Sequence, residues 1–369
     1  AGLTVVGLTG SSGKTTTKDC VAAVASLLGP TVAPPGSLNN ELGYPYTALR
    51  AGADTRYLVL EMGARGAGHI AYLCGIARPR IGVVLNVGVA HLGEFGSVAA
   101  IAAAKGELVE ALPADGVAVL NADDPRVAAM AERTAAAVTL VGQAPHARVR
   151  AVDVRLDERG RAAYTLVADG VSAPVRLRLT GAHQVGNTLA AAGVGLALGL
   201  DVARVAEALS AVRAVSPRRM DVFDRPDGVT VIDDSYNANP ASTSAALRAL
   251  ATLGQGRRTV AVLGYMAELG DYEVAGHEQV GRLAADLGVD TLVVIGDAAP
   301  IDAGARSRPG WKGESVTVTD QDAAVAALRE RLRPGDVVLV KGSHHRTWQV
   351  ADWLREPVAE TARGEVVAQ

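Results

Sequence analysis

Short apolar runs alternate with helical patterns along most of the chain. Residues 3–8 (LTVVGL) form the first run, which is rich in β-branched residues, and a helical pattern follows from Lys14. Apolar strands that alternate with helices are typical of a parallel sheet covered by helices on both faces. The first half is therefore predicted to be an α/β domain, with further strands at 56–61, 81–87 and 117–121 and helices at 14–28, 66–77, 97–111 and 124–134.

The pattern changes twice further along. Between about 146 and 180, apolar residues recur at every second position, which predicts a small antiparallel patch attached to this domain. Helices are expected at 182–199 and 201–212, and the Ser-Pro of RAVSPRR (213–219) predicts a hinge. A second alternating unit predicts a Rossmann-like α/β domain, with strands at 229–233, 258–263, 291–295 and 336–340 and helices at 240–252, 274–287, 321–332 and 346–355. The predicted domains are residues 1–213 and 214–369.

Composition excludes several classes of function. The 369 residues suffice for two domains, and the net charge of −3 offers no basic surface for nucleic acid or an anionic membrane. No apolar run reaches the roughly 18 residues of a membrane helix, and no signal-peptide pattern opens the chain. Cys20 and Cys74 match no metal spacing and lie in apolar helical patterns, which favours reduced, buried thiols over a disulfide. We therefore expect a cytoplasmic protein without membrane insertion. We also expect a monomer, although no feature of the composition bears on the oligomeric state.

The strongest chemical signal is TGSSGKTTT (9–17), between the first strand and the first helix. Glycines let backbone N–H groups curl around a phosphate at a helix N-terminus. Lys14 would contact the β and γ oxygens of a nucleotide, and the Thr15 hydroxyl would bind Mg²⁺. The strict P-loop pattern fails because Leu8 stands at its first glycine, so a chance Gly-Lys-Thr is the alternative reading. The predicted phosphate loop of this first, ATP-binding domain comprises Gly10, Ser11, Ser12, Gly13, Lys14, Thr15 and Thr16.

Three further side chains suggest a metal site. Glu61 ends an apolar strand in LEMGARG (60–66), at the sheet edge where ligands bind, so its carboxylate is a candidate Mg²⁺ ligand. His91 opens HLGEFGS after another strand, and Lys105 lies in AAAKGE on a helix of small residues. Only five of the 36 Lys and Arg residues are lysines, and a desolvated amine, unlike a guanidinium, can lose its proton and react. A solvent-facing carboxylate, a surface histidine and a solvated lysine are the alternative readings.

These motifs together resemble the muramyl ligase family. From residue 3 to about 355, TGSSGKTTT, SLNNELGYP, EMGARG, HLGEFGS, AAAKGE, GAHQVGN, RRMD, DDSYNANP and ELG occur in the family's order. EMGA and DDSYNANP are typical of the branch that joins D-alanyl-D-alanine to UDP-N-acetylmuramoyl-tripeptide in peptidoglycan synthesis. The resemblance implies a ligase that phosphorylates a carboxylate with ATP and passes the acyl phosphate to an amine. It also implies two Mg²⁺ ions, and a UDP-muramoyl peptide and a dipeptide as small-molecule partners.

The resemblance assigns roles to individual residues. Lys105 matches a lysine that takes up CO₂ and, as a carbamate, holds a second Mg²⁺ with His91, while Arg219 in RRMD matches a hinge arginine that reaches the γ-phosphate. The implied catalytic set is therefore Lys14, Glu61, His91, Lys105 and Arg219, with Thr15, Glu61, His91 and Lys105 as metal ligands. Asn187, on one helix face with His183, matches the adenine site, and Asp234 and Tyr236 match the ribose edge. The implied substrate residues are Asn39, Asn40, Asn237, Asn239, Lys341 and Ser343, although the asparagines also read as polar turns and helix starts.

The chain departs from the family pattern at three places. The family carries a UDP-sugar-binding domain ahead of the phosphate loop, whereas this chain opens at Ala1 in a strand, so we expect that domain to be either removed or naturally absent. Tyr265 replaces an acidic residue, and His344 replaces an arginine, in the domain that receives the amine. Two alternatives stay open: a shortened paralogue that ligates another acid and amine, as in secondary metabolism, and a nucleotide-binding protein without catalysis. Retention of the four residues Lys14, Glu61, His91 and Lys105 argues against the second alternative.

Overall fold

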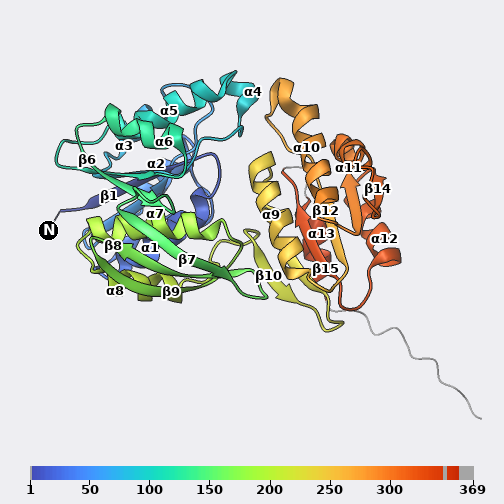
Figure 1. Cartoon of the computed structure of the whole chain (residues 1–369). Coiled ribbons are helices and arrows are strands. Elements are labelled where there is room, and N and C mark those ends of the chain that lie inside the picture. Colours follow the sequence, from blue (N-terminus) through green and yellow to red (C-terminus); the bar gives the residue numbers. More distant parts are fainter. Residues whose placement is uncertain (1, 344–346, 357–369) are drawn as a thin grey trace, which may run out of the picture.

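The computed structural model describes residues 2–343 and 347–356, and it shows two lobes (Figure 1). The chain leaves the first lobe after helix α8 (Val202–Ala211) and enters the second at strand β10 (Asp221–Asp224). The predicted hinge at 213–219 is the connection between them. Within the described residues, no helix is both long enough and apolar enough to cross a membrane.

A nine-stranded sheet forms the centre of the first lobe. The order across it is β2 (Thr31–Val32), β3 (Tyr57–Glu61), β1 (Thr4–Thr9), β4 (Ile81–Val84), β5 (Val117–Asn121), β6 (Ala137–Gly142), β7 (Val149–Leu156), β8 (Arg161–Ala168) and β9 (Val171–Thr180). The strands are parallel from β2 to β7, and β7, β8 and β9 pair antiparallel. The predicted antiparallel patch therefore exists, but it extends the parallel sheet through the β6–β7 pair instead of forming a separate layer.

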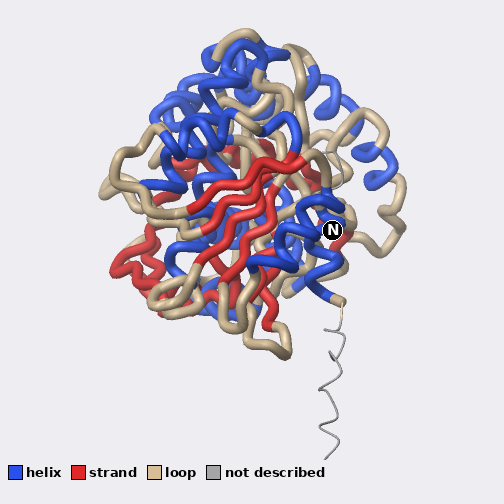
Figure 2. Tube along the Cα trace, turned by 90° about the vertical axis from the view of Figure 1, so that its right-hand side faces the viewer, coloured by secondary structure: helices blue, strands red, loops and turns tan. Residues whose placement is uncertain are grey.

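Helices cover both faces of this sheet, as the alternating pattern predicts (Figure 2). Helices α1 (Lys14–Ser26), α7 (Gln184–Ala197) and α8 bury Val21, Leu189 and their neighbours against one face. The other face carries α2 (Gly43–Ala48), α3 (His69–Ile76), α5 (Val98–Glu110) and α6 (Pro125–Ala128), whose core includes Ile70 and Leu108. A 3₁₀ turn, η1 (Ala129–Arg133), continues α6, so the helix predicted at 124–134 changes type midway.

The second lobe is a smaller α/β layer structure around a six-stranded sheet. Its order is β10, β11 (Thr230–Asp233), β15 (Val337–Lys341), β12 (Thr259–Leu263), β13 (Thr291–Ile295) and β14 (Glu314–Val318), with only the edge strand β10 antiparallel. One face carries α9 (Pro240–Leu253), α10 (Glu273–Asp286) and α11 (Pro300–Arg306), and the other carries α12 (Gln321–Arg331) and α13 (Trp348–Arg355). Short 3₁₀ turns are η2 (Gly270–Tyr272) and η3 (Gly296–Ala298).

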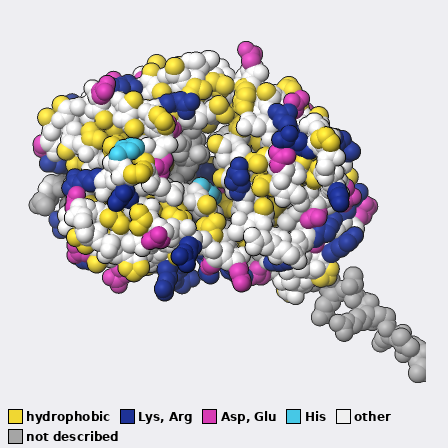
Figure 3. Space-filling model, viewed as in Figure 1, with side chains coloured by type: hydrophobic (Ala, Val, Ile, Leu, Met, Phe, Trp, Pro, Cys, Tyr) yellow, Lys and Arg dark blue, Asp and Glu magenta, His cyan; other side chains and the backbone are white. Residues whose placement is uncertain are grey.

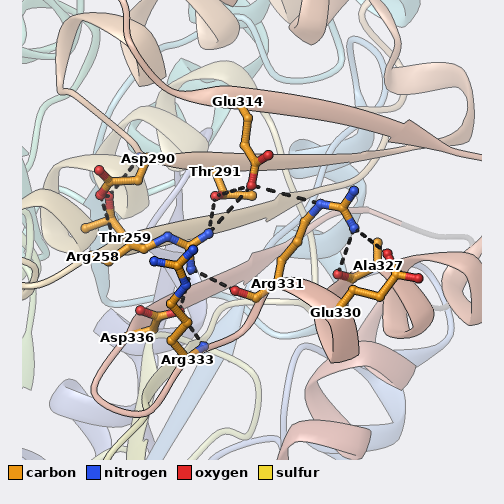
Figure 4. A network of polar contacts seen from close by, with 10 residues as sticks. All are labelled: Arg258, Thr259, Asp290, Thr291, Glu314, Ala327, Glu330, Arg331, Arg333 and Asp336. Atoms are coloured by element: carbon orange, nitrogen blue, oxygen red, sulfur yellow. Dashed lines mark hydrogen bonds and ion pairs between the residues drawn. The ribbon is translucent and has the colours of Figure 1, made fainter.

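A polar network fastens the amino ends of four strands in the second lobe (Figure 4). Arg258, just before β12, donates to Asp336 Oδ2 at 2.7 Å and to Thr291 Oγ1 at 2.7 Å. It also donates to the carbonyl oxygen of Arg331 at 2.9 Å, and the Asp336 carboxylate is only 3% exposed. Ligands bind at the carboxyl ends of parallel strands, so a network at the amino ends stabilises the domain and does not shape the site.

The predicted fold class is confirmed: a P-loop α/β domain with an antiparallel extension precedes a Rossmann-like α/β domain. The boundary between residues 213 and 214 stays a prediction. The sequence reading did not include β2, β6, β10, β14, α2, α11 or the short helix α4 (Leu92–Phe95).

Candidate functional site

One cavity of about 880 Å³ lies where the carboxyl ends of the two parallel sheets face each other. Residues after β1, β3 and β4 line it from the first lobe, and residues after β11 and β15 line it from the second. The space-filling view shows the surface indented between the lobes (Figure 3). All of the predicted site residues line this cavity except Gly10, Lys105 and Ser343. The structure thus brings together residues that the sequence scatters over some 330 positions.

The predicted phosphate loop connects β1 directly to α1. Gly13 has a left-handed backbone (φ +82°), and a Cβ there would lie 2.4 Å from Asn187 Oδ1, so only glycine fits. Asn86 pins the loop from the end of β4: its Oδ1 accepts from Ser12 N at 3.0 Å and its Nδ2 donates to Ser12 O at 3.1 Å. The loop therefore stands preformed at the N-terminus of α1, the arrangement that binds phosphate groups.

Lys14 folds back over this loop. Its Nζ donates to the carbonyl oxygen of Gly10 at 2.8 Å. Burial lowers the pKa of Lys14, while the nearby Glu61 carboxylate opposes the shift. The amine lies near both the loop and Glu61. A bound polyphosphate would be attracted by the Lys14 ammonium, and a cation bound to it would be attracted by the Glu61 carboxylate.

Glu61 is the last residue of β3 and is 1% exposed. Its Oε1 accepts from Ser37 Oγ at 2.8 Å and from Asn39 Nδ2 at 2.6 Å. Its Oε2 is buried and has no hydrogen-bond partner in the described part of the chain. A buried, unpartnered carboxylate oxygen beside a phosphate loop fits a Mg²⁺ ligand. Within residues 2–343 and 347–356, no group of three or more His, Cys, Asp or Glu side chains gathers as a metal site.

Lys105 and His91 lie near Lys14 of the phosphate loop. Lys105, on α5, is 3% exposed, and burial with help from the charge of Lys14 lowers its pKa to about 7. His91, in a left-handed backbone (φ +62°), precedes α4. Burial lowers the pKa of His91, whereas the Glu268 carboxylate, which contacts its Nδ1, opposes the shift. Near neutral pH a large share of the Lys105 side chains is therefore an uncharged, nucleophilic amine.

Arg219 reaches from the hinge into the first lobe. Its Nη2 donates to Thr15 Oγ1 at 3.1 Å, and its guanidinium lies 4.1 Å above the Tyr236 ring. The flanking residues Arg218 (φ +60°) and Met220 (φ +52°) both have left-handed backbones, which are costly for residues with side chains. The hinge therefore holds a strained conformation that places Arg219 against the phosphate loop.

Asp234 and Lys341 form a buried ion pair at the ends of β11 and β15. Asp234 Oδ1 accepts from Met220 N at 3.1 Å, so this pair also ties down the hinge. Lys341 is 2% exposed, and burial lowers its pKa while the Asp234 carboxylate opposes that shift. Its Nζ donates to Asn237 O at 2.9 Å. The ribose role of Asp234 and the substrate roles of Lys341 and Asn237 stay predictions.

Several predicted substrate residues have local structural duties as well. Asn40 Oδ1 accepts from Gly43 N at 2.8 Å, at the start of α2. Asn239 caps α9 by accepting from Ser242 N at 2.9 Å. Ser343 lies outside the cavity wall, where its Oγ accepts from Ala267 N and donates to Tyr265 O, both at 3.1 Å. His344, the third departure from the family pattern, lies outside the described residues.

The sequence reading missed Asn86 and Glu268 as site residues. Asn86 falls inside the strand predicted at 81–87, which in the structure ends at Val84. A polar residue at the end of an apolar strand is the signal that identified Glu61, and it applies equally to Asn86. Glu268 lies in the ELG motif after β12, but nothing local indicates that it contacts His91 of the other lobe.

Two family models match the chain. Residues 8–195 match the Mur ligase middle domain, and residues 218–344 match the Mur ligase, glutamate ligase domain. The UDP-N-acetylmuramoyl-tripeptide--D-alanyl-D-alanine ligase of Mycobacterium tuberculosis is 55% identical, over 93% of this chain and 71% of that protein. The ligase of the same name from Escherichia coli K12 is 35% identical, over 92% of this chain and 74% of that protein.

Solved structures agree with these matches. A crystal structure of MurF from Acinetobacter baumannii has a TM-score of 0.85 and 31% identity, and covers 96% of this chain and 77% of that one. MurF ligase from Thermotoga maritima, solved in complex with ADP, has a TM-score of 0.80 and 30% identity, over 95% of this chain and 79% of that one. Both lobes and their relative placement thus have solved counterparts.

Proposed function

The chain belongs to the Mur ligase family, and on that basis we propose that it uses ATP to join D-alanyl-D-alanine to a UDP-N-acetylmuramoyl-tripeptide. The names of the relatives from Mycobacterium tuberculosis and Escherichia coli support this pair of substrates. The chemistry itself rests on one observation: a phosphate loop, an acidic residue with a free buried oxygen and an arginine from the hinge meet in one cavity between two lobes. ATP in the loop would present its γ-phosphate to an acid in that cavity.

The first chemical step is an in-line attack of the tripeptide carboxylate on the γ-phosphate, which releases ADP and forms an acyl phosphate. Negative charge spreads over the transferring phosphoryl group, and Lys14 and Arg219 supply fixed positive charge around it. Lys14 already lies on the phosphate loop, and Arg219 lies 3.1 Å from the Thr15 hydroxyl. Neither side chain needs a large movement to reach the phosphate, so the site is preorganised for this step.

In the second step the free amine of the dipeptide attacks the acyl carbon, an amide bond forms and inorganic phosphate leaves. Water would hydrolyse the acyl phosphate if it entered first, so the lobes must hold the cavity closed. Arg218 and Met220 bind the hinge to Asp352 and Asp234 of the second lobe. Arg219 connects the hinge to Thr15 of the first lobe, so these contacts together favour one relative placement of the lobes. The products are one amide, one ADP and one phosphate.

The residues present fit two Mg²⁺ ions. Thr15 and Glu61 would hold one, and His91 with the Lys105 carbamate would hold the other. Bound Mg²⁺ supplies positive charge that neutralises the phosphate oxygens. The carbamate forms when the neutral amine of Lys105 adds to CO₂ and releases one proton, which requires the lowered pKa that burial provides.

The test is ADP release with a panel of acids and amines. We expect turnover only when an acid and an amine are both present, with UDP-N-acetylmuramoyl-tripeptide and D-alanyl-D-alanine giving the highest kcat/KM. Turnover with a different acid–amine pair, and none with this one, would favour the shortened paralogue. Absence of ligation with every pair, despite ATP binding, would favour the catalytically inactive protein.

The replacement of an acidic residue by Tyr265 is weaker support for a paralogue with other substrates than the sequence alone suggests. Its ring stacks on His277 with 5.3 Å between ring centroids, and its hydroxyl bonds to the Glu273 carboxylate. The side chain thus belongs to the packing at the start of α10 and does not line the cavity. A change of acidic residue to tyrosine at this position leaves the cavity wall intact.

A further inference from the structure

The ELG loop of the second lobe touches the first lobe beside the candidate metal ligands. Glu268 has a left-handed backbone (φ +64°), which turns its side chain and its carbonyl oxygen toward the other lobe. Its carboxylate contacts His91 Nδ1, a buried atom without a hydrogen-bond partner among the described residues, and lies 3.3 Å from the Arg65 guanidinium. Its carbonyl oxygen accepts from Gly93 N at 3.1 Å. One residue of the second lobe therefore contacts three residues of the first.

Two glycines allow this approach. A Cβ on Gly93 would lie 2.8 Å from Gly270 N and 3.0 Å from Gly270 Cα, and a Cβ on Gly270 would lie 2.6 Å from Gly93 Cα. All of these neighbours are backbone atoms, which cannot rotate away. The turn η2 can therefore lie on helix α4 only because neither position carries a side chain.

We propose that Glu268 is a positioning residue that couples closure of the lobes to assembly of the metal site. The inference rests on the proposed function, since it assigns His91 to a Mg²⁺ ion. A histidine that offers one ring nitrogen to a metal is typically held through the other by a carboxylate, which sets the tautomer and the ring orientation. Here that carboxylate comes from the opposite lobe, so His91 would be held in the ligand orientation only when the lobes are closed.

The physical consequence is a reciprocal coupling. If closure favours metal binding at His91, metal binding must favour closure by the same factor. Acyl phosphate would then form only after the water-excluding contact is made, because the site is complete only in that state. Arg65 lies 3.3 Å from the second Glu268 oxygen, which helps to direct the carboxylate at this contact.

Two variants test the contact in different ways. Glu268→Gln keeps the length of the side chain but removes its charge, and Gly93→Ala keeps the charge but blocks the backbone approach. Arg159→Ala is the matched control, since Arg159 and Asp224 form an exposed ion pair that also spans the lobes, away from the cavity. Thermal unfolding and nucleotide binding by each variant establish that it is folded.

The primary readout is the distance between the lobes, which does not depend on ligation. Spin labels at Asp54→Cys and Lys312→Cys, both exposed, report it by pulsed electron resonance, with a non-hydrolysable ATP analogue and a range of Mg²⁺ concentrations. We expect Glu268→Gln and Gly93→Ala to shift the distribution to longer distances. We also expect the Mg²⁺ concentration for half-maximal closure and ligation to rise about tenfold or more, with KM for ATP nearly unchanged. Arg159→Ala should match the parent.

Either of two results overturns the proposal: a parent-like distance distribution in both variants, or a parent-like Mg²⁺ titration in both. Failure of the proposed function looks different, because the unmodified protein would then not ligate D-alanyl-D-alanine to the UDP-N-acetylmuramoyl-tripeptide. A protein that does not ligate this pair, but whose lobes move apart on Glu268→Gln, would show that the Glu268 contact holds the lobes together although the assigned reaction is wrong.

Discussion

The side chain of Lys105 offers the sharpest test of the site chemistry. With its pKa lowered to about 7, a large share of the Lys105 amines is neutral at pH 7.5, against about one in a thousand for an ordinary lysine. Only the neutral amine adds CO₂. Burial thus raises the reactive fraction by several hundredfold, and the main cause is desolvation, with the charge of Lys14 second.

Replacement by alanine should therefore abolish ligation and leave nucleotide binding intact. Lys105→Ala empties a buried position beside His91, and a short carboxylic acid such as acetate should restore part of the activity by standing in for the carbamate. Lys105→Arg is the matched control: the guanidinium stays protonated and fills the space, so it should be inactive and not respond to acetate. ADP release measures activity, and binding of a fluorescent ATP analogue measures the nucleotide site.

The pH dependence gives a second readout on the unmodified protein. After CO₂ is removed and then restored at the same concentration of dissolved CO₂ at every pH, the rate of reactivation should rise about tenfold per pH unit below 7 and level off above it, because the amine loses its proton there. A carbon-13 carbamate signal should appear with the same rate. Full activity of Lys105→Ala without added acid, or no effect of CO₂ removal, would refute the role of the carbamate.

The remaining predictions concern stability, measured by urea unfolding. Arg258→Ala should lower the free energy of unfolding by about 2 kcal/mol, because it removes the guanidinium partner of the buried Asp336 carboxylate while leaving ADP binding unchanged. Gly281→Ala should cost about 1–3 kcal/mol, because its Cβ would lie 1.9 Å from Ile301 O where α10 crosses α11. Gly75→Ala, in a helix with nothing within 4 Å of the new Cβ, should instead stabilise by about 0.5–1 kcal/mol; a loss there would contradict the packing argument.

Strand ends proved the most informative feature of the sequence. Glu61 and the phosphate loop follow apolar runs, and the structure places both at one edge of the sheet, lining one cavity. That prediction works because the carboxyl ends of parallel strands share an edge, whatever the order of the strands. The prediction requires only the position at which each apolar run ends, and a single sequence contains that information.

Short and edge elements could not be predicted in the same way. Strand β2 has only two residues and is defined by its pairing with Tyr57 and Leu58 of β3. It is too short for its own sequence to show a strand pattern. Strand β10 (DVFD) has no continuous apolar run, because it is a half-exposed edge. Strand β6 (AVTLVG), in contrast, is a short apolar run of the kind that predicts a strand, so its sequence is sufficient to predict it.

Contacts between the lobes are the part that sequence cannot supply. Glu268 and His91 belong to different domains, and their contact depends on the hinge conformation set by Arg218 and Met220. Likewise Asn40 and Asn239 read equally well as turn residues and as substrate residues. In the structure Asn239 caps α9 and Asn40 accepts a hydrogen bond from Gly43 N at the start of α2, while both also line the cavity. Residue types alone do not separate these two duties.

The central claim is that the γ-phosphate of ATP is handed to an acid inside this cavity. The most direct measurement uses the acid substrate labelled with oxygen-18 in its carboxylate, followed by mass spectrometry of the phosphate released during ligation. We expect one labelled oxygen in each phosphate, since the acid oxygen that attacks phosphorus leaves with it. Unlabelled phosphate, released together with ADP and the amide, would show that no acyl phosphate forms from this acid.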